Sequence, residues 1–352
     1  MLPYWLLFLI PAYAALRERP GQHWHLRRQP LLLGAVALLG LMIGFRYQVG
    51  GDWGSYIAYL YSAQFMGFLD ALMARDPGYI LLNWLASNSI NEIWLVNLAC
   101  GLIFSIGLVS FARTQPRPWL VIAVAVPYLV IVVAMGYSRQ GVAIGLTMLG
   151  IVALVRDRST LKFILWIAFA ASFHRSAVML VPIAALSMGR GRYWAAIWVG
   201  IATIVLYFLF LDDSVDSLVS GYIEAEYQSQ GAAIRIAMNA LPSAMLLIFR
   251  KRFPFLPGEW LLWRNMGLLS LFFVVLLIVS PSSTAVDRVA LYLIPVQLFV
   301  LSRLPDAFPS RRAGVDPMVL MVVLYSAAVQ FIWLNFAGHS SAWVPYQLYP
   351  LV

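Results

Sequence analysis

Long apolar stretches, separated by shorter polar segments, run through almost the whole chain. They are long enough to cross, or nearly cross, a hydrocarbon core of about 30 Å, and they span residues 2–16, 30–45, 93–112, 119–135, 140–155, 161–173, 176–188, 193–211, 235–249, 261–280, 287–303 and 316–336. The pattern predicts an all-α fold, a polytopic membrane bundle of about 12 transmembrane helices, in which residues 1–352 form a single domain.

The segments 161–173 and 176–188 are the critical pair in this topology, because they are short and lie close together. If they formed one helix over 161–188, every later loop would change sides. With the two segments separate, most of the 24 lysine and arginine residues fall in alternate loops, which is the asymmetry expected of cytoplasmic loops. The charge distribution therefore favours two helices and places both termini outside.

Two of the outer loops are long. In the loop 46–92, residues 56–74 are predicted to form an amphipathic interfacial helix. Residues 79–88 are apolar but too short to span, and they predict a re-entrant or interfacial segment. The loop 212–234 is acidic, and either it shields a site from free anions or it is an ordinary solvated loop. Its charges are Asp212, Asp213, Asp216, Glu224 and Glu226.

Composition excludes several classes of protein. With 62% hydrophobic and 11% charged residues and a mean hydropathy of +0.81, the chain is not a soluble domain. The net charge is +9, but the sequence contains no run of basic residues typical of nucleic-acid binding. Cys100 is the only cysteine, so neither an internal disulfide nor a cysteine metal site is expected. No phosphate-binding glycine loop, metal-ligand spacing or outer acidic pair is present, and we predict no metal and no cofactor.

Six arginines fall on the predicted outer side, against the general rule for basic residues: Arg46, Arg75, Arg139, Arg175, Arg235 and Arg288. All except Arg75 lie at the end of an apolar segment. An arginine within the bilayer costs about 3 kcal/mol, whereas each charge-assisted bond to phosphate returns about 1.5–3 kcal/mol. Each arginine alone is equally compatible with snorkelling to lipid headgroups. Together they indicate a polyanionic ligand, for which a lipid-linked pyrophosphate is the leading candidate.

The sequence around two of these arginines is distinctive. After Arg46, the pair Gly50-Gly51 permits a tight turn that returns Asp52 toward the helix end; an Arg46–Asp52 ion pair is one interpretation, and ligand binding by Arg46 is the other. Arg139 and Gln140 follow Tyr137 at the start of a helix, where backbone N–H groups favour an anion. We therefore predict that Tyr137, Arg139 and Gln140 contact the ligand.

His174 is the only histidine next to these arginines. Neighbouring positive charge lowers a histidine pKa and keeps the ring neutral, as a general base requires. His174 is thus the first candidate base and Asp52 the second, although a structural role for His174 is equally compatible. Arg175 directly follows His174 and is a supporting ligand contact.

The remaining candidates lie on other segments. We predict that Asp287 caps a helix, that Arg288 faces the site, and that Tyr292, one turn further on, contacts the substrate. Arg235 contacts either phosphate or the acidic loop. Tyr79, in the turn after Asp76-Pro77, either stacks on a sugar or has a structural role.

These motifs together resemble the EpsG family of Wzy-like polysaccharide polymerases. The resemblance covers nearly the whole chain and rests on FRYQVGGDW (45–53), DPGYILLN (76–83), SRQG (138–141), FHRSA (173–177), the DR and LY pairs between 287 and 292, and WVPY (343–346). The residue before Pro77 is Asp here, where Glu is the more frequent family residue.

The resemblance implies a metal-independent membrane glycosyltransferase that is similar to the multi-helix, lipid-dependent glycosyltransferases (GT-C type). It would act at the outer (periplasmic) face of a bacterial inner membrane on undecaprenyl-pyrophosphate-linked oligosaccharide, as donor and as acceptor, in exopolysaccharide or O-antigen synthesis. A flippase and a chain-length regulator would be its pathway partners. We expect Arg139, Arg288 and Arg46 on the pyrophosphate, with Arg175 and Arg235 supporting them.

Two other functions fit the same sequence. An O-antigen ligase or a lipid-linked single-sugar transferase would use the same donor chemistry with a different acceptor. An exporter or flippase of an anionic lipid or glycan is the non-enzymatic alternative. Transport favours charged or broken helices at the midplane, and the apolar segments here are nearly free of charge.

Overall fold

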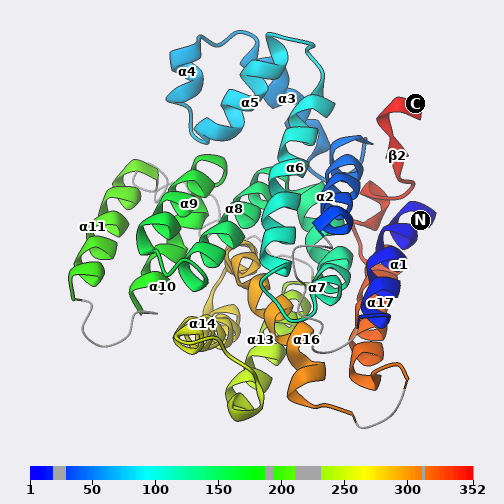
Figure 1. Cartoon of the computed structure of the whole chain (residues 1–352). Helices are drawn as coiled ribbons and strands as arrows, with labels where there is room; N and C mark the ends of the chain where they lie inside the picture. Colours follow the sequence, from blue (N-terminus) through cyan, green and yellow to red (C-terminus); the bar gives the residue numbers. More distant parts are fainter. Residues whose placement is uncertain (19–28, 187–192, 211–230, 311–313, 352) are drawn as a thin grey trace.

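The computed structural model describes residues 1–18, 29–186, 193–210, 231–310 and 314–351 (Figure 1). Most of the described chain is helical. The helices are α1 (Leu2–Leu16), α2 (Gln29–Gly44), α3 (Trp53–Ala63), α4 (Phe68–Leu72), α5 (Pro77–Ser87), α6 (Ile93–Ala112), α7 (Pro118–Ala125), η2 (Val126–Ala134), α8 (Ser138–Val155), α9 (Thr160–Phe173), η3 (Arg175–Leu180), α10 (Val181–Leu186), α11 (Tyr193–Phe210), α13 (Ala232–Ile248), η5 (Arg250–Arg252), α14 (Glu259–Val279), α15 (Ser283–Ala290), η6 (Leu291–Leu293), α16 (Ile294–Ala307), α17 (Pro317–Phe336), η7 (Ser340–Ala342) and η8 (Tyr349–Leu351). The strands β1 (Arg46–Tyr47) and β2 (Gln347–Leu348) form one short antiparallel pair.

In the described ranges, every predicted apolar segment coincides with a helix or with two or three consecutive helical pieces. Within the described ranges, five helices are long and apolar enough to cross a membrane: Ile93–Ala112, Ser138–Val155, Glu259–Val279, Ser283–Ala307 and Pro317–Phe336. The chain is therefore an all-α, multi-pass membrane protein, and the crossing of the shorter segments stays a prediction. Prolines set several helix starts: Pro118 and Pro317 occupy the first turn of α7 and α17, where a missing N–H costs nothing.

The helix break predicted between 161 and 188 is confirmed. α9 ends at Phe173, and His174 has an extended backbone with φ −155° and ψ 108°. The chain resumes at Arg175 as the 3-10 helix η3. An extended residue stops the helical hydrogen-bond ladder, so residues 161–188 are not one helix.

The centre of the bundle is the continuous segment formed by α7 and η2. Almost all of its side chains are at most 8% exposed, and it packs against α1, α16 and α17. The η2 portion is π-helical and contains Pro127 near its start. Proline lacks an N–H and disturbs the regular ladder, which accounts for a wider turn at this point.

Helices α6 and α8 pack closely through glycines. A methyl group placed on Gly107 would lie 2.1 Å from the carbonyl oxygen of Gly145, and one on Gly145 would lie 2.7 Å from Cα of Phe104. Small residues at such a crossing allow two membrane helices to approach backbone to backbone. This contact fixes the start of α8, where Arg139 lies.

Gly107→Ala is expected to destabilise the protein by about 1–3 kcal/mol, because the added methyl group collides with the backbone and not with a mobile side chain. Gly34→Ala in α2 is the matched control, since nothing lies within 4 Å of its added methyl group. Thermal midpoints in detergent would compare the two variants. Equal midpoints would show that the α6–α8 crossing tolerates a wider separation.

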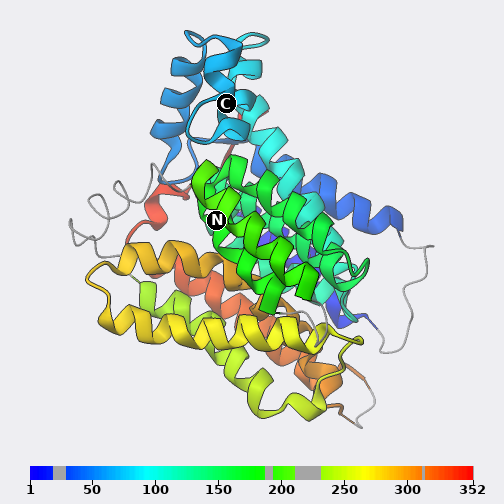
Figure 2. The ribbon, with the colours of Figure 1, turned by 90° about the vertical axis from the view of Figure 1, so that its left-hand side faces the viewer.

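The first long loop forms three short helices, α3, α4 and α5, which project beyond the other helices in both views (Figures 1 and 2). The single helix predicted over 56–74 is wrong: α3 ends at Ala63, and α4 begins separately at Phe68. Gly67 interrupts the run with an extended backbone, and its N–H is capped by Asp70 at 3.0 Å. The apolar stretch 79–88 lies in α5. Of the acidic loop 212–234, residues 212–230 lie outside the described residues.

Residues after α17 return to the first part of the chain. β2 pairs with β1, and the amide of Gly50 donates to the carbonyl of Ala342 at 2.8 Å. Trp343 is 2% exposed, and its indole N–H donates to the carbonyl of Ile131 at 2.7 Å. The segment after α17 is thus part of the core and packs against η2.

Two basic residues of the predicted inner loops are buried in ion pairs. Arg117 lies 3.0 Å from Asp306, and Arg303 lies 3.2 Å from Glu259, with both arginine side chains 3% exposed. These pairs join the start of α7 and the start of α14 to α16. Basic residues in this region therefore bind helices together in addition to setting topology.

Candidate functional site

Arginines from separate helices act together on His174. Arg139 lies at the start of α8, Arg175 begins η3, and Arg288 lies in the last turn of α15. Burial, together with the charges of Arg139, Arg288 and Arg175, lowers the pKa of His174 to about 3. The imidazole is therefore neutral at physiological pH, and its three cationic neighbours form one electropositive site.

Tyr292 determines how the His174 ring is oriented. Nδ1 of His174 lies 3.1 Å from the hydroxyl oxygen of Tyr292, and that oxygen lies 3.5 Å from the carbonyl oxygen of His174. Both contacts are satisfied when Nδ1–H donates to Tyr292 and Tyr292 donates to the carbonyl. The lone pair is then on Nε2, the atom that would accept a proton. Tyr292 itself is 1% exposed, and its hydroxyl is placed to orient His174.

Asp76 joins the projecting helices to the arginines. Its Oδ2 accepts a hydrogen bond from Arg139 at 2.6 Å, and its Oδ1 lies 4.0 Å from Nε of Arg175. The Arg139 guanidinium also lies 4.9 Å from the ring centroid of Tyr59. The sequence indicated only a turn at Asp76, because a single carboxylate before proline carries no sign of its distant partner.

Asp287 and Arg235 form a bidentate ion pair. Nε and an Nη of Arg235 donate to the two carboxylate oxygens of Asp287 at 2.8 and 2.7 Å. The prediction that Asp287 caps a helix is wrong. α15 begins earlier and is capped by Ser282, whose hydroxyl accepts from the amide of Ala285 at 3.5 Å. Asp287 instead lies inside α15 and holds Arg235 from α13.

Arg288 differs from the other arginines of the site. Its guanidinium carbon lies 4.3 Å from the ring centroid of Tyr137, and no carboxylate of the described residues lies within ion-pair distance of it. Gln140 is 1% exposed and donates from its amide to the carbonyl oxygen of Arg288 at 2.5 Å. Gln140 therefore fixes the backbone of Arg288, whose guanidinium stacks on an aromatic ring and forms no ion pair with the described residues.

Arg46 lies apart from this cluster. It is 0% exposed and donates to the carbonyls of Ile43 and Val49 at 2.6 and 3.2 Å, and to the hydroxyl of Ser138 at 2.7 Å. The Arg46–Asp52 ion pair is not formed. Instead, the guanidinium holds the turn after α2 against the start of α8.

Asp52 lies with the site arginines. Burial raises the pKa of Asp52, while the charges of Arg288 and Arg139 oppose that rise. The turn that brings Asp52 here depends on Gly50, whose φ is +109°. A side chain at Gly50 would also lie 2.7 Å from the carbonyl oxygen of Met135. Asp52 is thus placed as the second candidate base, in the electric field of the same two arginines.

Tyr79 is 0% exposed and packs against Tyr56 and Tyr59, with ring centroids 5.8 Å apart in both pairs. This burial argues against direct stacking of Tyr79 on a sugar. Tyr59 is only half-buried and lies next to Arg139, so a ligand bound at Arg139 can reach its ring. No sequence pattern distinguished Tyr59, because α3 contains several tyrosines at similar positions.

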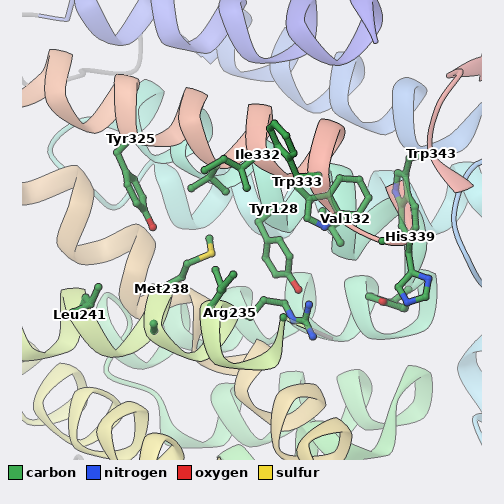
Figure 3. Close-up of a pocket in the computed structure, with 18 residues that line it drawn as sticks. Tyr128, Val132, Arg235, Met238, Leu241, Tyr325, Ile332, Trp333, His339 and Trp343 are labelled. Atoms are coloured by element: carbon green, nitrogen blue, oxygen red, sulfur yellow. The ribbon is translucent and has the colours of Figure 1, made fainter. Parts of the chain in front are cut away.

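A cavity of about 620 Å³ adjoins the site (Figure 3). It lies between α13 and α17, and Tyr128 and Val132 of η2 also line it. Most of its walls are apolar. Arg235 and Tyr137 line it, so it adjoins the ion pair with Asp287 and the ring on which Arg288 stacks. None of the wall residues on α17 was among the sequence candidates, since an apolar residue in a membrane helix has no distinguishing pattern.

No group of three or more His, Cys, Asp or Glu side chains that could hold a metal ion occurs among the described residues. The chemical groups that the site does offer are guanidinium groups, a neutral imidazole, carboxylates and aromatic rings. These groups suit binding of a phosphorylated ligand and proton transfer.

The fold and this site define a multi-pass helical membrane protein with an electropositive, aromatic-lined site between helices. The chain belongs to the EpsG family, whose model matches residues 31–348. Neither the curated proteins nor the solved structures contain a match. Family membership makes the chain a Wzy-like polysaccharide polymerase in general terms and agrees with an enzyme of the glycosyltransferase kind.

Proposed function

We propose that the protein extends a polysaccharide by transferring the growing glycan from undecaprenyl pyrophosphate to a hydroxyl of a lipid-linked repeat unit. The supporting observation is Arg288, which stacks on Tyr137 and forms no ion pair with the described residues, beside a neutral His174. Arg288 and Arg139 bind the pyrophosphate of the donor, and Arg175 and Arg235 support them. The reaction takes place on the outer, periplasmic side of the inner membrane, where the positive-inside asymmetry puts these arginines.

In the transfer step, the acceptor hydroxyl oxygen attacks the anomeric carbon of the sugar attached to the donor pyrophosphate. The bond between that carbon and the phosphate oxygen breaks, and undecaprenyl pyrophosphate leaves with the electron pair. The hydroxyl proton moves to Nε2 of His174. The arginines stabilise the negative charge that develops on the leaving group, which is the largest electrostatic demand of such a step.

The donor also changes the basicity of His174. A pKa near 3 makes a weak proton acceptor, and part of this depression comes from Arg139, Arg288 and Arg175. A bound pyrophosphate offsets their positive charge and raises the pKa of His174 toward its ordinary value. The base is therefore strongest when the donor is in place. Asp52 is the alternative base.

Purified protein is expected to lengthen a lipid-linked repeat unit with no other enzyme present, and His174→Gln is expected to slow this at least about 100-fold. Gel analysis of the glycan products measures both. Lys162→Gln is the control, since Lys162 is exposed, pairs with Asp157 and lies in a predicted inner loop away from the arginine cluster. Absence of extension by the wild-type protein contradicts the proposal, and full activity of the His174 variant transfers the role of base to Asp52.

The family assignment favours the polymerase over the two other functions. The lipid-linked glycans of a deletion strain separate them further. Loss of a polymerase leaves single repeat units on the carrier, loss of a ligase leaves long chains on the carrier, and loss of an exporter leaves glycan on the inner side.

A further inference from the structure

The cavity between α13 and α17 has exposed apolar residues at its rims among the described residues. Both helices pack on α16, and the residues at the rims are exposed: Ile234 and Leu241 on α13 are 66% and 67% exposed, and Ile332 and Phe336 on α17 are 54% and 72% exposed. Side chains from both helices project into the space between them (Figure 3). A long apolar molecule can therefore enter sideways from the bilayer without crossing the headgroup region.

The two ends of the cavity differ in polarity. Arg235, Tyr137 and His339 line the end that adjoins the arginine cluster, whereas Leu241 and Tyr325 line the other end. From Phe336 to Tyr325 the axis of α17 rises about 16 Å, roughly half of the hydrocarbon core. The lining fits an amphiphile with an anionic head at the Arg235 end and an apolar chain directed toward Tyr325.

The cationic end is directly connected to the proposed chemistry. The ring of Tyr137 lines the cavity on one side and carries the Arg288 guanidinium, at 4.3 Å from its centroid. Arg235 reaches the same end and is fixed there by Asp287. A pyrophosphate placed at this end adjoins Arg235 and the ring of Tyr137, on which Arg288 stacks, with its lipid in the cavity.

We infer that this cavity, which we call the α13–α17 groove, holds the part of the polyprenyl chain that is next to the pyrophosphate of the lipid-linked donor. The inference rests on the proposed function and adds the location of the lipid. The charge at one end selects a chain with an anionic head. The volume of about 620 Å³ lies within the usual range of small-molecule sites. The aromatic walls, which include Tyr128 of η2 and Trp333 of α17 (Figure 3), provide large contact areas for a branched hydrocarbon.

The test fills the groove with a larger side chain. Val329→Trp on α17 and Met238→Trp on α13 each place an indole in it, from opposite walls, so that one variant remains if the other does not fold. Leu324→Trp is the control, because Leu324 lies on α17, is 59% exposed and does not line the groove. Each protein is first checked for a single symmetric peak in size-exclusion chromatography.

Binding is measured by native mass spectrometry with undecaprenyl pyrophosphate alone and, separately, with phosphatidylglycerol. We expect wild type and Leu324→Trp to bind undecaprenyl pyrophosphate, and the groove variants to bind it at least about 10-fold more weakly. Unchanged binding in a folded groove variant overturns the inference. Equal binding of phosphatidylglycerol and undecaprenyl pyrophosphate by wild type also overturns it, since the groove is then a site for ordinary membrane lipid.

A kinetic readout separates this inference from the proposed function. With repeat-unit donors on undecaprenyl pyrophosphate and on ethyl pyrophosphate, which lacks a prenyl chain, the groove variants should raise KM at least about 10-fold for the undecaprenyl donor only. An equal rise for both donors overturns the inference. If wild type extends neither donor but still binds undecaprenyl pyrophosphate through the groove, the proposed function fails and the location of the lipid stands.

Discussion

Replacing Arg288 with alanine is expected to reduce kcat/KM for glycan extension by at least about 100-fold. A bidentate arginine–phosphate contact contains two charge-assisted bonds of about 1.5–3 kcal/mol each. Loss of about 3 kcal/mol corresponds to a factor of about 100. Arg288 forms no ion pair with the described residues, so only its stacking on Tyr137 is lost, and stability should fall by about 1 kcal/mol or less. Extension rates and thermal midpoints of the purified variant measure both effects.

Two further variants sharpen the Arg288 result. Arg288→Lys keeps the charge without the planar fork and should retain an intermediate rate. Arg264→Ala is a matched loss of one positive charge, because Arg264 donates only to its neighbour Asn265, at 3.1 and 3.0 Å; its rate should be unchanged. A normal rate for Arg288→Ala would remove Arg288 from the donor site. Arg139→Ala is less informative, since it also leaves buried Asp76 without its 2.6 Å partner.

The second large effect is expected on stability. Arg46→Ala should destabilise the protein by at least about 3 kcal/mol. The substitution leaves the carbonyls of Ile43 and Val49 and the hydroxyl of Ser138 without their donors, at about 1–3 kcal/mol for each buried group. It also empties the space of a fully buried side chain. The fraction of monodisperse protein after detergent extraction and the thermal midpoint measure the loss.

Arg46→Lys is the informative companion. Lysine restores the charge, but its single ammonium group lacks the planar set of donors that bonds all three acceptors. We therefore expect most of the destabilisation to persist. If instead Arg46→Ala gives a stable protein that lacks activity, Arg46 contacts the ligand directly, as the sequence pattern suggested. The two outcomes thus separate a positioning role from a binding role.

Much of the helical framework was predictable from the sequence. Apolar length located the membrane segments, and charge asymmetry supported the break at His174, because both are local properties of the chain. The split between α3 and α4 was not predicted. Apolar side chains continue through Phe65 and Met66, and the cap that Asp70 makes on Gly67 depends on backbone geometry.

The candidate site was predictable in its residue types and less so in its pairings. Arginine at a helix end signals charge, but its partner depends on which helices adjoin. Arg235 pairs with Asp287 across 52 positions, and Arg139 pairs with Asp76 across 63. The burial of Arg46 and Tyr79 likewise comes from packing between distant segments. Sequence periodicity contains none of this information.

The antiparallel pairing of residues 46–47 with 347–348 has a consequence for biogenesis. Ribosomes release β1 long before β2 exists, so the turn that carries Gly50 and Asp52 lacks one of its supports while the intervening helices are being inserted. The structure around Arg46 is completed only after the segment that follows α17 has been synthesised and has packed there. An affinity tag or fusion partner that pulls on that segment therefore disturbs residues at the opposite end of the gene.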